Sequence, residues 1–170
     1  MRLMGKLRLI DNEGGGFGLA VVPQILFPTG SAASFRGEDT LAVEPRVALD
    51  YRFKFGLAII ANLGVFARTY NQNLDFGRTR VPSRVTYGLG AAMNLPKGFG
   101  AGLELAGAIG LSALDGGALY APAELSFFGR WAAKSGIGAL FGVAPGLSGA
   151  VGSPSVRIFA GFTYAPRALP

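Results

Sequence analysis

The residues of this chain whose types could do chemistry are carboxylates and guanidiniums, because the sequence contains no His and no Cys. Glu44 and Asp50 lie an even number of positions apart, so they share one face of an extended strand. Glu104 and Glu124 are expected on neighbouring strands. Paired carboxylates are the groups that general acid and base catalysis by a chain without His would need.

Arginines accompany these carboxylates closely enough to neutralise them. Arg46 and Arg52 each lie two positions from a carboxylate, and Arg84 and Arg130 fall on the polar faces of other predicted strands. A guanidinium pairs with a carboxylate through a planar fork, so a structural network is favoured over a catalytic site. Known membrane-barrel enzymes rely on a His, and zinc sites rely on His or Cys. The sequence therefore predicts no enzyme, no metal site and no cofactor.

The elements that must position these side chains show a two-residue period in nine segments of about ten to fourteen residues. Such segments are longer than strands of soluble sheets and suit a tilted crossing of a bilayer. The predicted segments are 2–10, 17–27, 40–53, 56–70, 83–95, 99–113, 121–131, 137–147 and 155–164.

The third segment shows the separation of faces most clearly. Val47, Leu49 and Tyr51 share one face, and Asp50 and Arg52 share the other. Two patterns are weaker, because segment 137–147 is apolar on both faces and Pro23 interrupts segment 17–27. The pattern predicts an all-β, antiparallel, up-and-down sheet.

Composition favours a membrane environment. Half of the residues are hydrophobic, only 15% are charged, and the mean hydropathy is +0.39. No apolar run reaches the ~20 residues of a membrane-spanning helix. A closed barrel is the other backbone arrangement that satisfies its hydrogen bonds in lipid, so a transmembrane β-barrel is predicted.

Alternation alone does not say which face of the barrel is inside. A soluble lipocalin-like barrel that binds a small apolar ligand has the same period, and this alternative stays open. Only four Lys occur, however, and Lys54, Lys97 and Lys134 fall in predicted turns rather than on a solvated strand face. We therefore expect the polar face to line a charged lumen. The predicted lumen-lining residues are Glu44, Arg46, Asp50, Arg52, Asn62, Arg68, Arg84, Glu104, Glu124, Arg130 and Arg157.

Aromatic residues near the predicted strand ends are typical of the two interfacial girdles of a membrane barrel. The predicted girdle residues are Phe17, Phe27, Phe53, Tyr70, Phe99, Tyr120, Trp131 and Tyr164.

Connection lengths predict the orientation. Short turns alternate with the longer stretches 29–39, 71–82, 114–120 and 148–154, as periplasmic turns alternate with extracellular loops. The first and last segments then run in the same direction, which indicates an odd number of strands. The N-terminal residues also lack the apolar core of a secretory signal. Both observations predict an incomplete barrel that missing N-terminal strands or self-association would close.

Three stretches resemble barrel domains of the OmpA family of Gram-negative bacteria: residues 18–30 with Phe35 and Gly37, residues 44–52, and residues 156–162. The resemblance implies an outer-membrane location, a barrel domain over 1–164 and a tail over 165–170 that begins a periplasmic linker. It also implies that peptidoglycan is bound only through a following domain, which these 170 residues do not include.

The expected function is that of a passive pore or a structural membrane scaffold, with an Arg excess that favours anions. Membrane lipid is the expected partner, and Arg36, Arg78 and Arg80 in the loops could meet lipopolysaccharide phosphates. The net charge of +6 is dispersed among strands and turns, so nucleic acid is not expected.

Overall fold

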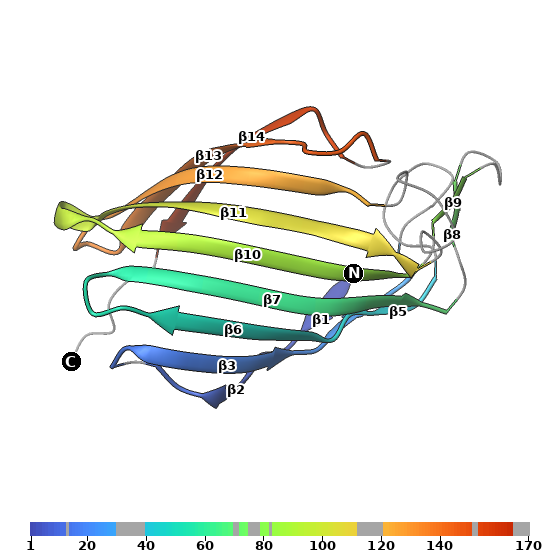
Figure 1. Cartoon of the computed structure of the whole chain (residues 1–170), viewed down its shortest axis with the longest axis horizontal. Helices are drawn as coiled ribbons and strands as arrows, with labels where there is room; N and C mark the ends of the chain where they lie inside the picture. The colour runs from blue at the N-terminus through green and yellow to red at the C-terminus, as the bar shows by residue number, and fades with distance from the viewer. Residues whose placement is uncertain are drawn as a thin grey trace.

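The computed structural model describes residues 1–12, 14–29, 40–69, 72–74, 79–81, 83–111, 121–150 and 153–164. Most of them form one antiparallel sheet of 12 strands, drawn in Figure 1. Six long strands pair in chain order along the main part of this sheet. They are β7 (Leu57–Arg68), β10 (Arg84–Asn94), β11 (Phe99–Gly110), β12 (Ala123–Ala132), β13 (Ile137–Pro145) and β14 (Val156–Tyr164).

The other six strands of the sheet are the halves of three interrupted segments. They are β1 (Arg2–Met4) with β2 (Leu7–Ile10), β3 (Gly16–Val22) with β4 (Gln24–Leu26), and β5 (Ala42–Val43) with β6 (Arg46–Arg52). Twelve strands thus follow the nine predicted segments, and the up-and-down antiparallel order is confirmed.

The prediction of continuous strands is wrong at these three segments. Pro23 and Pro45 lie at two of the breaks, and proline has no N–H to donate to a neighbouring strand. Their carbonyls still accept bonds across the breaks, from Gly5 N at 3.1 Å and from Val65 N at 3.2 Å. The interruptions of neighbouring segments are therefore bridged, and each segment keeps its place in the sheet.

Short turns gather at one end of the sheet, which we call the turn end. They are 11–15, in which residue 13 lies outside the described residues, 53–56, 95–98 and 133–136, and the third contains η3 (Pro96–Gly98). Lys54, Lys97 and Lys134 are exposed in three of these turns, and Lys97 has the left-handed φ of 63°. The predicted alternation of short and long connections is confirmed.

The opposite end, which we call the loop end, carries the longer connections. Much of the predicted loops 29–39, 114–120 and 148–154 lies outside the described residues. Predicted loop 71–82 contains a small separate hairpin of β8 (Gln72–Leu74) and β9 (Thr79–Val81), which the sequence pattern did not indicate.

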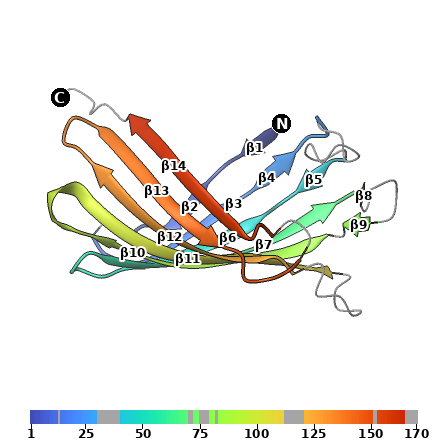
Figure 2. The ribbon, with the colours of Figure 1, turned by 90° about the horizontal axis from the view of Figure 1, so that it is seen from above.

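The sheet is curved and is not closed into a barrel. Figure 2 shows β7, β10 and β11 at the bottom of a trough, with the edge strands β14 and β1 rising on the same side. Among the described strands, β14 pairs with β13 alone, and β1 and β2 pair with β4 and β3.

The two faces of the trough differ in side-chain burial. On the polar face lie most of the side chains that the sheet buries, including Phe66 and Glu44 at 2% exposure each. On the other face, large apolar side chains are exposed on strand after strand, for example Leu63 at 59% and Phe162 at 86%. Side chains converge on the inside of a curved sheet, so the polar face is concave and the apolar face is convex.

Candidate functional site

The strand registers place the predicted lumen-lining residues on one face. Arg46 on β6 is paired with Gly64 on β7, Gly64 with Thr86 on β10, and Thr86 with Ala108 on β11. The side chains of paired residues lie on the same face, so the face that bears Arg46 extends from β6 to β11. The pairings of β12, β13 and β14 extend the same face to Arg157 on the last strand. That these residues line a water-filled lumen stays a prediction.

Hydrogen bonds on the concave face cross over an intervening strand at a small residue. Thr86 Oγ1 donates to Glu44 Oε1 at 3.0 Å across β7, where Gly64 lies opposite Thr86 on one side and Arg46 on the other. Arg46 donates to the same oxygen through Nε at 2.9 Å and Nη2 at 2.6 Å. A Cβ on Gly64 would lie 2.6 Å from Arg46 Cγ. The absence of a side chain at Gly64 is therefore what lets these three strands share one polar cluster.

Two further pairs repeat this arrangement. Arg157 Nη2 on β14 donates to Glu124 Oε1 on β12 at 2.9 Å, across β13 where Ala144 is 1% exposed. Asn12 Nδ2 donates to Asp50 Oδ2 across β3. The position between these two is Gly18, and a Cβ there would come within 2.5 Å of Asp50 Oδ1.

The fourth pair lies at the turn end. Arg130 Nη2 on β12 donates to Asn94 Oδ1 on β10 at 2.5 Å, across β11 at Gly100. Four such pairs brace the concave face at different positions along it. They also explain why Gly and Ala alternate with large polar side chains on this face.

Phe66 forms the most buried aromatic contact on the concave face. The guanidinium carbons of Arg68 and Arg84 lie 4.5 Å and 4.8 Å from its ring centroid. A guanidinium over an aromatic face is attracted by the ring quadrupole. These two predicted lumen residues are thus held near the loop end by an apolar residue of the polar face.

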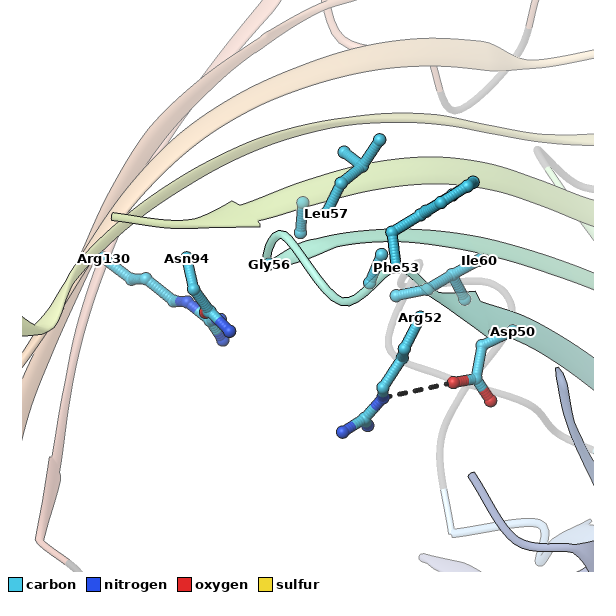
Figure 3. Close-up of a pocket in the computed structure, with 10 residues that line it drawn as sticks. Asp50, Arg52, Phe53, Gly56, Leu57, Ile60, Asn94 and Arg130 are labelled. Atoms are coloured by element: carbon cyan, nitrogen blue, oxygen red, sulfur yellow. Dashed lines mark hydrogen bonds and ion pairs between the residues drawn. The ribbon is translucent and has the colours of Figure 1, made fainter. Parts of the chain in front are cut away.

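Cavities open along the described part of the concave face, and two of them are lined by most of the predicted charged residues. The larger, of about 430 Å³, is lined by most of the predicted residues of the middle and loop end: Arg46, Asn62, Arg84, Glu104, Glu124 and Arg157. The smaller, of about 270 Å³, lies at the turn end and is lined by Asp50, Arg52 and Arg130 among others. Figure 3 shows this turn-end cavity, with Arg52 joined to Asp50 and with Arg130 beside Asn94.

The predicted aromatic girdle falls on described residues mainly at the turn end. Four of its members are exposed on the convex face there: Phe17, Phe99, Trp131 and Tyr164. Phe99 at the start of β11 lies directly opposite Trp131 on the neighbouring strand β12. Phe53 is half-buried beside the turn and contacts Tyr51, with ring centroids 4.8 Å apart.

The remaining girdle residues give little information about the loop end. Phe27 is half-buried there, just after β4. Tyr70 and Tyr120 lie outside the described residues, as do Arg36, Arg78 and the tail 165–170. The side chain of Arg80 is also not described.

The predicted lumen-lining set leaves out four contributors to the site, Asn12, Phe66, Thr86 and Asn94, although the sequence pattern puts Thr86 and Asn94 on the polar face. For three of them the two-residue period of a strand gives the face, since Phe66 shares its face with Arg68, and Thr86 and Asn94 share theirs with Arg84. Asn12 had no such signal because it lies in a turn.

In the part of the chain that the structure describes, no helix is long and apolar enough to cross a membrane. No cluster of three or more potential metal-binding side chains occurs among those same residues.

Comparison with known proteins gives one family. The family model described as "Putative MetA-pathway of phenol degradation" matches residues 1–110, which is more than half of the chain. No curated protein matches the chain. The resemblance to the OmpA family stays a prediction.

Proposed function

The chain belongs to this MetA-pathway family, and we propose that it forms the wall of an outer-membrane β-barrel in a Gram-negative envelope. The convex face contacts lipid, and the concave face lines an aqueous passage for small solutes. The barrel is a passive pore and carries out no catalysis.

The observation that carries this proposal is the exposure of the convex face. Its apolar side chains are exposed across the whole sheet, from Val47 at 44% on β6 to Ile158 at 83% on β14. Soluble monomers rarely expose contiguous apolar patches larger than a few hundred Å². A lipid-facing band of a membrane barrel has this character, with alternate residues pointing to a polar interior. The soluble lipocalin-like alternative requires the opposite curvature, with apolar side chains on the concave face.

The concave face supports the passage. Its paired carboxylates and guanidiniums satisfy each other, as in the Glu44 and Arg46 pair at 2.6 Å, so the wall is polar without being chemically reactive. The predicted lumen residues contain six arginines and four carboxylates. Charged rings set the selectivity of pores, so this excess favours small anions over small cations.

The partners of the barrel are proposed from the same features. Membrane lipid covers the convex face, and the aromatic girdle at the turn end lies at one membrane interface. Lipopolysaccharide is a proposed partner of the loop end, and the OmpA-family resemblance supports the outer-membrane location. The description of the matched family concerns phenol degradation, so phenol is the first neutral solute to assay.

Two experiments test the proposal. Cell fractionation of the full-length protein is expected to place it in the outer-membrane fraction and to require detergent for extraction. A monodisperse, detergent-free monomer in plain buffer would overturn the membrane assignment. Planar-bilayer recording is expected to show steps of conductance with anion selectivity, and swelling of vesicles in phenol tests passage of a neutral solute. Membrane insertion without conductance or swelling would leave only a scaffold role.

A further inference from the structure

The turn-end cavity contains a guanidinium that is anchored by a neutral group. Arg130 Nη2 binds the amide oxygen of Asn94 at 2.5 Å, whereas Arg46 binds the carboxylate of Glu44 at 2.6 Å. An amide positions a guanidinium without cancelling its charge. Arg130 therefore presents a positive charge on the concave face.

The side chain of Arg130 is exposed and lies across β11. A Cβ on Gly100 would lie 2.7 Å from Arg130 Nε and 3.0 Å from its Cγ, so the side chain lies flat across β11 at this glycine. A guanidinium has five N–H donors, and the bond to Asn94 is made by Nη2. A preorganised fork loses little conformational entropy when it binds a carboxylate.

The other side of the cavity contributes a carboxylate, that of Asp50, and a second guanidinium, that of Arg52. Arg52 Nε lies 3.4 Å from Asp50 Oδ2, and Asp50 also accepts a hydrogen bond from Asn12. The formal charges of Arg52, Arg130 and Asp50 sum to +1. Asp50 is already engaged on its own strand and by Asn12, so its charge acts mainly on Arg52.

The floor of the cavity is apolar. Ala58, Ile60 and Ala92 line it, and Ile60 is a large aliphatic residue exposed on the concave face at 41%. The volume of about 270 Å³ is below that of most drug-sized pockets, so the occupant must be small.

We propose that the turn-end cavity is a binding subsite for a small organic carboxylate with a compact apolar body. The carboxylate binds the fork of Arg130, Arg52 adds attraction from the opposite side, and the apolar body covers Ile60. The inference rests on the proposed function, because solutes reach the cavity only if the concave face is wet. It names the class of solute for which that face is selective.

Binding of benzoate to the purified full-length protein in detergent micelles tests this subsite, with empty micelles as the blank. Titration calorimetry is expected to show saturable binding, with acetate and benzyl alcohol each binding at least about tenfold more weakly, because each lacks one of the two recognised parts. Arg130→Gln is expected to weaken benzoate binding by about tenfold or more. Arg8→Gln is the matched control, since Arg8 lies on β2 with its own partner Asp11 at 2.9 Å and is expected to leave affinity unchanged.

A second variant keeps the test readable if Arg130→Gln fails to fold. Ile60→Ser is expected to weaken benzoate binding while leaving acetate binding unchanged. Equal binding of benzoate and benzyl alcohol, or an equal loss in Arg8→Gln and Arg130→Gln, would overturn the subsite. Conductance without benzoate binding would overturn the subsite alone, and benzoate binding without conductance would overturn the pore alone.

Discussion

Thr86 and Glu44 are hydrogen-bonded at 3.0 Å although a whole strand separates them, and the residue of that strand opposite Thr86 is Gly64. Neighbouring strands lie about 4.8 Å apart, so a bond of this kind needs a curved sheet and an unobstructed path. The same relationship recurs for Arg130 and Asn94 at Gly100. Small residues on the concave face thus determine which polar side chains meet.

The first prediction concerns the path across β7. Gly64→Ala would place a Cβ 2.6 Å from Arg46 Cγ and 2.8 Å from Thr86 Oγ1. We expect a loss of unfolding free energy of about 1–3 kcal/mol from overpacking, measured by urea titration of the folded protein in micelles. Gly161→Ala is the control, because a Cβ there meets nothing within 4 Å. Equal effects of the two variants would show that Gly64 does not have this role.

The second prediction concerns the buried carboxylate. Glu44 is 2% exposed, and Glu44→Ala leaves Arg46 and Thr86 without their shared acceptor. Breaking a buried pair costs about 3–5 kcal/mol, but the Arg46 side chain is 36% exposed and water can reach it, so we expect about 2 kcal/mol. Glu104→Ala, at an exposed position of the same face, is expected to change the unfolding free energy by less than about 0.5 kcal/mol. The same urea titration compares them, and a similar cost for both would contradict the role of the cluster.

A third prediction distinguishes the two faces of one strand. Leu63 and Ile60 both lie on β7, on the convex and the concave face respectively. Leu63→Lys is expected to lower the yield of folding into vesicles and to cost about 2–4 kcal/mol, as a lysine near the bilayer midplane does. Ile60→Lys is expected to fold normally, since it lies opposite Asp50. If Leu63→Lys is as well tolerated as Ile60→Lys, the convex face is not in lipid.

A fourth prediction uses the sole tryptophan of the sequence. Trp131 is 39% exposed on the convex face, at the end of β12 next to a turn. In vesicles, its fluorescence is expected to be quenched more strongly by lipids labelled near the headgroup than by lipids labelled near the bilayer centre, since Trp prefers the interface. The reverse order of quenching would place the turn end inside the hydrocarbon region.

The strand segments could be predicted from the sequence because the two-residue period is set by each strand alone. Segment 56–70 became β7 with its bounds shortened by one residue at the start and two at the end. Pro23 was recognised as a weak point of its segment, whereas the break at Pro45 was not predicted, and both breaks lie at the level where the neighbouring segment is also interrupted.

The face on which each candidate site residue lies could be predicted from the two-residue period of its strand. The residue to which it is hydrogen-bonded could not be predicted in this way. Nothing in the spacing of Arg130 and Asn94 indicates a contact, since it depends on β11 lying between them and on Gly100 being at the crossing point. Phe66 shares its face with Arg68 on the same strand, but its contact with Arg84 depends on the pairing of β7 with β10.

The lysines of the turns have a consequence for how the proposed barrel would contact lipid. Lys54, Lys97 and Lys134 come from three separate turns, yet all three ammonium groups lie at the turn end of the sheet. Negatively charged headgroups attract each lysine near a membrane surface by about 1 kcal/mol. In the proposed barrel, this rim of the sheet is therefore electrostatically matched to the headgroups of an anionic leaflet.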